Sequence, residues 1–441
     1  MDIAVIGSGI AGLSCAWHLR HAGGDAPNVT LFESDPRAGG HANTVDVTLD
    51  GTTHPVDTGF LVFNRRTYPG LVAWFDRLGV ETLPSEMTFS VRLDDVDAST
   101  IEWAGTDLGT VFTQRANLVR PRFLRMLADL LRFNRAARAL AAAGTDGALD
   151  TWTLGEYLDA HHYSAAFRDW YLLPMAAAIW SCSTAQMHDF PLSTFVRFCA
   201  NHGLLQIVDR PQWFTVRGGS RTYVDRVLAD LPDVRLGQRV LRVARVETGR
   251  TSRLAVATAN GASLFDHVVF ACHSDQALRA LHAPDRDQRD ALGAVRYQPN
   301  RAILHTDTRV LPSNPTAWAA WNYRSDLDAA APSERRVAVH YLIDKLQPLP
   351  FDRPVIVSLN PTRPIDEDRV LQSFDYEHPV FDRAALVAQT RIDAIQGRGN
   401  VWFCGAWTGH GFHEDGMRSG CRVADAIHAL RVGAAEVRLA A

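Results

Sequence analysis

The stretch IAVIGSGIAGLSCAWHLRHAGG, residues 3–24, decides the fold. Its first four residues are apolar and predict a strand, and the residues after the third glycine predict a helix that ends at the glycine pair 23–24. The first glycine permits a tight turn, the second lets backbone N–H groups approach a pyrophosphate at the positive helix end, and the third allows close packing of helix on strand. We therefore predict a pyrophosphate site at Gly7, Gly9, Ile10, Ala11 and Gly12.

A second predicted strand, NVTLFES at residues 28–34, ends in the acid Glu33, followed by Ser34. A carboxylate about 20 residues after the glycine motif can accept hydrogen bonds from the adenosine ribose. Soon afterwards the glycine pair Gly39-Gly40 and a turn at 57–59 allow the backbone to approach a ligand again. A second approach directly after the ribose-binding acid suits a longer cofactor lying extended across the domain. The sequence therefore predicts FAD.

The run 33–41, ESDPRAGGH, resembles the E-x-x-x-R-x-G-G-R signature of the flavin-containing amine oxidase superfamily, which includes phytoene desaturases and protoporphyrinogen oxidases. His41 stands where the signature has its last arginine, so the phosphate contact of that arginine must be weaker or come from another residue. The resemblance implies a cofactor site that extends beyond the first loop. Its further members are Ser34, Arg37, Gly40, His41, Thr58, Gly59, Phe60 and Val240.

A second glycine-rich stretch, GAWTGHGFHEDGMRSG, occupies residues 405–420. It follows a predicted strand at 400–404 and precedes a helix predicted to begin near Gly416. In the superfamily this helix points its N-terminus at the flavin pyrimidine edge, where negative charge gathers on reduction. The resemblance thus assigns Gly405, Gly416 and Met417 to the cofactor, although Ala406 replaces an acid that binds the ribityl chain in many relatives.

Two other interpretations of residues 405–420 remain open at this point. The stretch can be an exposed turn before a helix with an acidic first turn. Its histidines and acids can also ligate a metal, but their spacing fixes no coordination geometry and no outside ligand presents itself. We predict no metal site. As groups that could handle a proton we select His413, whose pKa could lie near neutrality, and Glu414 and Asp415, whose pKa burial would raise.

The fold class predicted is α/β, with a Rossmann-type FAD-binding domain and an interleaved α+β substrate domain. We assign residues 1–74, 210–290 and 393–441 to the first domain and residues 75–209 and 291–392 to the second. Alternating residues in RAILHTD, AWAAWNY, RVAVHYLID and PVIVSLN predict an antiparallel sheet in the second. No second glycine motif follows a strand, so no separate NADPH domain is expected.

Composition excludes several classes of function. The net charge of −4 over 441 residues gives no global attraction for nucleic acid. The six cysteines are scattered and indicate neither disulfides nor zinc. No apolar run approaches the roughly 20 residues of a membrane span, and the first strand leaves no room for a signal peptide. We expect a cytoplasmic protein of unknown oligomeric state.

Residues 115–138 carry seven arginines and one acid, Asp129. At helical spacing, Arg122, Arg125, Arg132 and Arg135 share one side with Asp129, and large apolar residues occupy the other. Such a helix, at 121–140, can lie on an anionic lipid surface as a peripheral membrane contact, and it is equally compatible with an ordinary solvated face.

The substrate is expected to be an apolar small molecule or lipid. Aromatic residues of the second domain, Trp170, Tyr171, Met175, Trp180, Trp318, Trp321 and Tyr323, can line an apolar pocket or simply fill a core. Simple amine oxidases of the superfamily hold a lysine near flavin N5, whereas the only lysine here is Lys345. Segments such as VDTGFLVFNRRTYP and FHEDGMRSG look like a bacterial subgroup found alongside cyclopropane-fatty-acid-synthase-like methyltransferases. This implies dehydrogenation of a fatty-acyl lipid; amine oxidation and a redox-neutral isomerase or lipid-binding protein remain alternatives.

Overall fold

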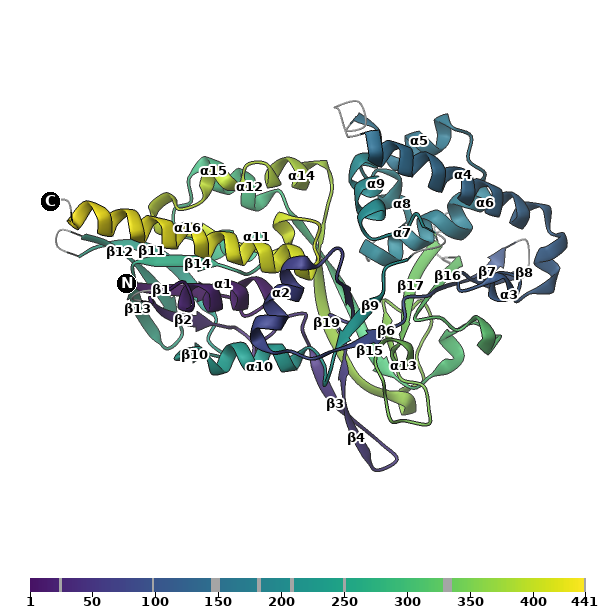
Figure 1. The fold of residues 1–441 in the computed structure, drawn as a ribbon, viewed down its shortest axis with the longest axis horizontal. Coiled ribbons are helices and arrows are strands. Elements are labelled where there is room, and N and C mark those ends of the chain that lie inside the picture. The colour runs from purple at the N-terminus through teal and green to yellow at the C-terminus, as the bar shows by residue number, and fades with distance from the viewer. Residues whose placement is uncertain are drawn as a thin grey trace.

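The computed structural model describes residues 1–23, 26–96, 99–143, 151–180, 184–206, 210–248, 251–327 and 335–439. They form two lobes between which the chain crosses repeatedly (Figure 1). One lobe contains a parallel sheet with helices, and the other a mixed sheet under a group of helices. The predicted α/β class, a Rossmann-type domain interleaved with an α+β domain, is confirmed.

A five-stranded parallel sheet, in the order β10-β2-β1-β14-β20, forms the core of the first lobe. Side chains of a strand alternate between its faces, so β1 buries Ile3 and Val5 towards α1 and α16, and Ala4 and Ile6 towards a small antiparallel sheet. This double burial explains its continuous apolar sequence. The strands are β1 (Asp2–Ile6), β2 (Asn28–Phe32), β10 (Asp233–Arg235), β14 (His267–Phe270) and β20 (Val401–Phe403), and the small sheet comprises β11 (Val240–Thr248), β12 (Thr251–Thr258) and β13 (Gly261–Phe265).

Helices cover both faces of this lobe. The last one, α16, runs along α1 in Figure 1, so segments from the two ends of the sequence lie side by side. It begins at His413, three residues before the predicted start, because the first turn already contains the acids that favour a helix N-terminus. The helices are α1 (Ile10–Arg20), α2 (Pro69–Leu78), α10 (Arg221–Ala229), α11 (Ser274–Ala280), α12 (Arg286–Gly293), α14 (Arg383–Gln389), α15 (Ile392–Ile395) and α16 (His413–Leu439).

The second lobe contains a seven-stranded sheet in the order β19-β15-β18-β17-β16-β7-β8. The four predicted strands pair antiparallel as expected, but β19 was not predicted and β7 pairs parallel with β16. Helix α7 packs on β16 and β17. The strands are β7 (Phe89–Val96), β8 (Ser99–Ala104), β15 (Arg296–His305), β16 (Trp321–Leu327), β17 (Arg335–Leu342), β18 (Ile356–Leu359) and β19 (Val370–Val380). The helices are α3 (Leu108–Val111), η1 (Arg115–Val119), α4 (Pro121–Ala143), α5 (Leu154–Ala160), α6 (Ala165–Phe167), η3 (Arg168–Leu172), α7 (Leu173–Trp180), α8 (Thr184–His188), α9 (Leu192–Asn201) and α13 (Ile343–Leu346).

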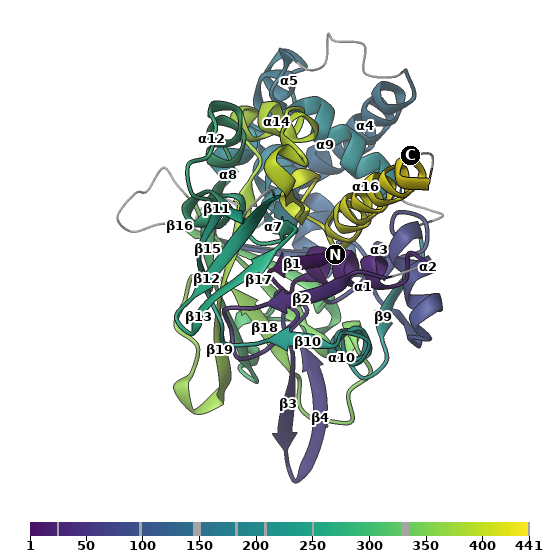
Figure 2. The ribbon, with the colours of Figure 1, turned by 90° about the vertical axis from the view of Figure 1, so that its left-hand side faces the viewer.

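Short strands join the lobes. A hairpin of β3 (Thr44–Leu49) and β4 (Thr52–Asp57) projects from the body in Figure 2, and β9 (Trp213–Val216) pairs with β5 (Phe63–Asn64) and β6 (Thr82–Ser85). The predicted domain boundaries at 74/75, 290/291 and 392/393 each cut a helix, namely α2, α12 and α15. Residues of α12, α14 and α15 share one buried cluster with β14 and β20, so these helices belong to the first lobe. Within the described ranges, no helix is long and apolar enough to cross a membrane.

Candidate cofactor and active site

The first glycine loop leads from β1 into α1 at the carboxyl edge of the parallel sheet. Gly7 has φ +106°, and a Cβ on Gly12 would lie 1.8 Å from the Gly7 carbonyl oxygen, so the turn itself needs both glycines. Gly9 differs, because a Cβ there would meet no atom within 4 Å. Helix α1 also begins without a capping side chain or an acid in its first turn. Open space therefore lies over a helix N-terminus, as an anionic pyrophosphate requires.

Glu33 follows the end of β2 beside this loop. Its Oε2 accepts hydrogen bonds from the backbone N–H of Ser8 at 2.8 Å and from the Ser8 hydroxyl at 2.6 Å. Its Oε1 accepts from the exposed Ser34 hydroxyl and from the backbone of Asp35. The backbone oxygen of Glu33 also accepts from Gln238, which brings the start of β11 at Val240 to the adenosine side. These four hydrogen bonds fill the four acceptor directions of the carboxylate, so a ribose hydroxyl would replace the exposed Ser34 hydroxyl as a donor to Oε1.

The segment 37–41 folds back over the first loop. A Cβ on Gly40 would lie 3.2 Å from the Cα of Gly9, so this glycine lets the two loops meet. The guanidinium of Arg37 donates to the Gly40 carbonyl at 2.9 Å and braces the segment. The His41 carbonyl accepts from the N–H of Phe60 at 2.8 Å, and a Cβ on Gly59 would lie 2.2 Å from the same oxygen. These contacts bring Arg37, Gly40, His41, Gly59 and Phe60 together beside the first glycine loop.

The ring of His41 lies between those of Tyr376 and His378, with centroids 5.0 and 5.1 Å away. Its Nε2 is buried and has no hydrogen-bond partner. Burial lowers the pKa of His41 well below its usual value, so the ring is neutral. The hydroxyl of Tyr376 in turn lies 2.8 Å from the Thr58 hydroxyl and accepts from Asn43. A neutral imidazole thus stands at the position of the arginine of the signature, and its Nε2 is available to a ligand.

The C-terminal stretch closes the opposite side. A Cβ on Gly416 would lie 2.6 Å from the Ile10 side chain, and one on Gly420 would lie 2.2 Å from the Ala11 carbonyl oxygen. The Ser14 hydroxyl donates to the carbonyl of Met417 at 3.0 Å, which fixes α16 on α1. Gly405 donates its N–H to the Ser419 hydroxyl, which ties the loop after β20 to the same helix. The two glycine-rich stretches therefore contact each other at the predicted cofactor site.

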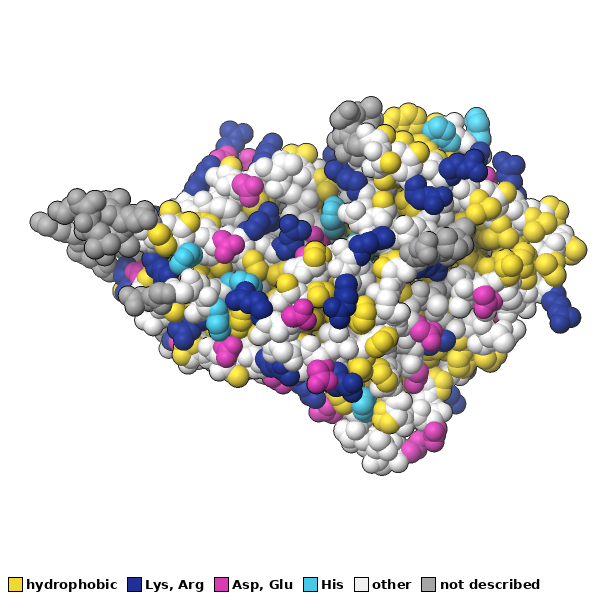
Figure 3. Space-filling model, in the orientation of Figure 1, with side chains coloured by type: hydrophobic (Ala, Val, Ile, Leu, Met, Phe, Trp, Pro, Cys, Tyr) yellow, Lys and Arg dark blue, Asp and Glu magenta, His cyan; other side chains and the backbone are white. Residues whose placement is uncertain are grey.

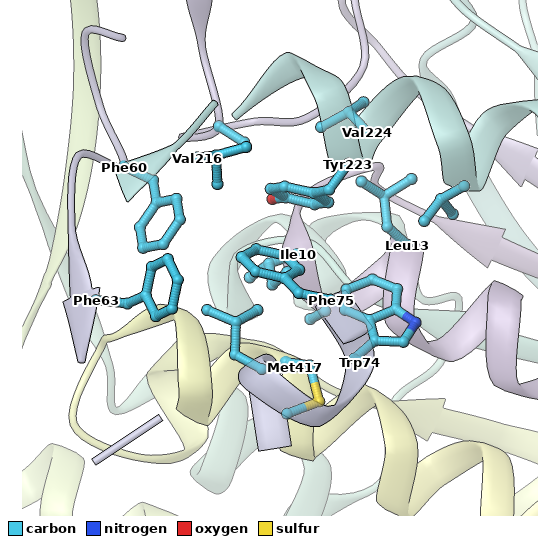
Figure 4. Packing of buried hydrophobic residues seen from close by; sticks show 14 of the residues in the cluster. Ile10, Leu13, Phe60, Phe63, Trp74, Phe75, Val216, Tyr223, Val224 and Met417 are labelled. Atoms are coloured by element: carbon cyan, nitrogen blue, oxygen red, sulfur yellow. The ribbon is translucent and has the colours of Figure 1, made fainter. Parts of the chain in front are cut away.

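His413 begins α16 and stacks on Phe60, with the ring centroids 3.6 Å apart. Its Nε2 lies 3.2 Å from the hydroxyl of Tyr223, and Figure 4 shows Tyr223 and Phe60 in the packed cluster around Ile10 and Met417. Burial lowers the pKa of His413 to about 3. The expectation of a pKa near neutrality is therefore wrong, since a desolvated imidazole without a charged partner stays neutral.

The two acids of the first turn have separate environments. The carboxylate of Glu414 accepts hydrogen bonds from the backbone N–H groups of Gly70 and Leu71 at 3.0 and 2.8 Å, so it caps the N-terminus of α2. Asp415 accepts from the backbone of Phe412 at 3.0 Å. Burial raises the pKa of both acids. Asp415 is the third residue of α16 and accepts the N–H of the residue before this helix, so both acids cap a helix N-terminus. The role of His413, Glu414 or Asp415 in handling a proton stays a prediction.

Most aromatic residues of the substrate domain fill its core. Trp170, Tyr171, Met175, Trp180 and Tyr323 are buried in one cluster, and Trp318 donates its indole N–H to Pro312. Trp321 differs, because it packs against the cores of both lobes together with Tyr341 and Phe412. Its indole N–H is buried without a partner. The sequence did not identify Tyr223, Tyr341, Tyr376 and His378 as site residues. Their only signal is the periodic pattern of apolar and aromatic residues in the helix or strand that contains them.

The residues fit FAD. Open space at Gly9 suits the pyrophosphate, the acid at the end of β2 suits the adenosine ribose, and the N-terminus of α16 suits the flavin ring. The Nε2 atom of His41 is a further buried polar group without a protein partner. Among the described residues there is no group of three or more histidine, cysteine or acidic side chains arranged to hold a metal ion.

The chain is similar to known proteins in sequence and in fold. The family described as flavin containing amine oxidoreductase matches residues 10–428. A putrescine oxidase structure superposes with a TM-score of 0.67 at 17% identity over 97% of this chain and 99% of its own. Cyclohexylamine oxidase from Brevibacterium oxydans IH-35A gives 0.67 at 15% identity over 97% and 98%.

A fatty acid isomerase from P. acnes gives a TM-score of 0.63 at 15% identity over 96% of this chain and 97% of its own. No curated protein sequence matches significantly. At these identities the structural likenesses show the fold, whereas the family match covers nearly the whole chain. The chain therefore belongs to the flavin-containing amine oxidoreductase family, and it is a flavin-dependent oxidoreductase with FAD as its cofactor.

Proposed function

We propose that this enzyme dehydrogenates an apolar substrate, a fatty-acyl lipid or a molecule of similar character, at the junction of the two lobes. When bound, FAD accepts a hydride from a substrate C–H bond. The protein has to bind the apolar chain, exclude water and take up one proton. The proposal concerns the substrate class within the family's oxidoreductase chemistry.

The main support is the state of the buried carboxylates. An amine substrate carries a positive charge, which a dry site must pair with an acid. Within the described part of the chain, every fully buried carboxylate already accepts a hydrogen bond at 3.0 Å or less from the protein. These are Asp57, Asp94, Glu102, Asp129, Asp307, Asp326 and Glu414. An ammonium group would have to share each of these carboxylates with the protein donors that already hold it, so an uncharged substrate fits better.

Aromatic side chains at the junction of the two lobes also favour an uncharged, apolar substrate. The boundary between the two cores is lined by Phe412, Trp321 and Tyr341, which pack against both. Phe412 stacks on Phe198 with the ring centroids 4.8 Å apart. The buried indole N–H of Trp321 is a single donor that can orient one polar group of an otherwise apolar molecule.

The lysine of simple amine oxidases has no counterpart in this site. Lys345 pairs with Glu86, with its Nζ 3.1 Å from Oε2, and lies at the end of β17 in the short helix α13. Arg301 in β15 pairs with Asp375 on the surface. An arginine does not give up its proton, so neither residue supports amine oxidation through a lysine-held water.

Anaerobic flavin reduction tests the proposal. The purified protein is mixed with phospholipid vesicles that contain unsaturated and methylated acyl chains, and separately with putrescine and cyclohexylamine, while the visible flavin band is recorded. Bleaching by lipid alone supports the proposal. Bleaching by either amine, with no response to lipid, would overturn it in favour of amine oxidation. Conversion of a lipid with a constant flavin band would assign redox-neutral isomerisation instead.

A further inference from the structure

The long helix α4 presents a surface that the proposed chemistry does not use. The sequence left open whether this helix lies on lipid through its apolar side or packs as an ordinary helix with a solvated face. Phe123, Met126 and Phe133 of the apolar side are fully buried in the core of the substrate domain. Asp129 was predicted on the solvated side and is also buried, where it accepts the N–H of Ser164 at 3.0 Å. The helix therefore cannot lie on a membrane through its apolar side.

Its outward side nevertheless carries large apolar residues. Leu124 and Leu131 are 44% and 56% exposed and lie seven residues apart, hence on one face of the helix. Leu118 and Val119, at the end of η1 just before α4, are 52% and 82% exposed. We call these four residues the α4 surface. Figure 3 shows hydrophobic side chains gathered at the end of the molecule that bears α3 and α6, with lysine or arginine side chains near them.

Positive charge surrounds these apolar side chains. Residues 115–138 contain seven arginines, and Arg125, Arg132, Arg135 and Arg138 are exposed on the outward side of α4. The only acid of this stretch, Asp129, is buried and bridged by Arg125 and Arg132 at 3.3 and 3.0 Å. The outward side thus has a strong net positive charge. Two copies of such a surface would repel each other, which disfavours self-association through it.

We propose that the α4 surface docks the enzyme on an anionic phospholipid bilayer. Leu118, Val119, Leu124 and Leu131 enter the interface between headgroups and acyl chains, while the arginines bind lipid phosphates. Apolar insertion and phosphate binding together give the two signals that stable peripheral binding needs. This inference does not depend on the substrate class, because it concerns binding without turnover.

Vesicle co-sedimentation of the flavin-loaded protein tests it. Wild type is expected to bind vesicles that contain phosphatidylglycerol, to bind pure phosphatidylcholine far more weakly, and to dissociate in about 1 M salt, where charges are screened beyond roughly 3 Å. The double variant Leu124→Gln/Leu131→Gln should lose about tenfold or more in partition coefficient. Arg135→Gln should lose roughly fivefold.

The matched control is Val387→Gln/Leu430→Gln, which changes two helical residues with 47% and 55% exposure in the other lobe. It should bind vesicles as the wild type does. Intact flavin absorbance shows that each variant is folded. Equal losses in both double variants, or equal binding to both kinds of vesicle, would overturn the proposal. So would a dimer without vesicles that only Leu124→Gln/Leu131→Gln abolishes, since a second copy would then occupy the surface.

Discussion

Replacement of Gly9 by alanine is expected to weaken FAD binding while leaving the stability of the apoprotein intact. The position has φ −66° and ψ 178°, which alanine adopts easily, and the added methyl group meets no protein atom within 4 Å. Without flavin, the variant should be as stable as the wild type or more stable by about 0.4–1 kcal/mol, because alanine restricts the unfolded chain.

With flavin the same methyl group occupies the space over the N-terminus of α1. The pyrophosphate must then withdraw from at least one backbone N–H group. A hydrogen bond to a charged group contributes about 1.5–3 kcal/mol, so the Kd should rise roughly ten- to hundredfold. Fluorescence titration of the apoprotein with FAD measures the Kd, and urea unfolding of the apoprotein measures stability.

The matched variant is Gly12→Ala, where the methyl group would lie 1.8 Å from the Gly7 carbonyl oxygen. The turn must shift, and overpacking of this kind costs about 1–3 kcal/mol or more in the apoprotein itself. The reasoning is refuted if Gly9→Ala binds FAD with wild-type affinity, or if it destabilises the apoprotein as much as Gly12→Ala does.

Three further predictions concern ionisable groups. Glu414→Gln should lower the free energy of unfolding by about 1–3 kcal/mol, because an amide cannot accept from both N–H groups of α2 as the carboxylate does; unchanged thermal unfolding would contradict the capping role. His413→Asn should slow flavin reduction without releasing flavin. The pH profile of reduction between about pH 5 and 8 should keep its shape, since a histidine with a pKa of about 3 does not titrate there. If stopped-flow data show that the variant loses an inflection of this profile, His413 titrates in that range and the assignment is wrong. His305 is fully buried, accepts the N–H of Asp307 on Nδ1 at 3.0 Å, and has its pKa lowered by burial to about 4. Because the folded pKa lies below the unfolded value of 6.5, stability is present above that value and falls by about 1.4 kcal/mol per pH unit down to about pH 4. The variant His305→Asn should show a shallower fall in urea unfolding between pH 6.5 and 4, and an equal slope would remove His305 as a cause.

The cofactor-binding half of the site could be predicted because its determinants are local. Strand, glycine turn and helix follow one another within about 20 residues, and the acid after the second strand lies in the next element of the same unit. The turn conformation at Gly7 and the packing at Gly12 depend on neighbours a few residues away. Local sequence therefore contains most of the information for this loop.

The rest depends on contacts between distant segments. The Tyr376 ring reaches His41 across more than 300 residues of chain, and Tyr223 reaches His413 across about 190. Neither contact leaves a motif, because any aromatic residue on the buried face of a strand or a helix gives the same pattern. Asp129 was placed on the wrong side of its helix, since spacing alone does not reveal the backbone donor at Ser164. The lowered pKa of His413 likewise follows from burial that the sequence does not show.

The packing of Gly420 against Ala11 has a consequence for synthesis on the ribosome. Translation proceeds at about 5–20 residues per second, so the roughly 400 residues between the two glycine stretches take about 20–80 s to make. During that time β1 has β2 as a neighbour but lacks β14, then β20 and α16. The face of α1 that later receives α16 stays uncovered until the last stretch emerges. Flavin capture should therefore be a late event, and a nascent chain that stops before α16 should depend on chaperones to remain soluble.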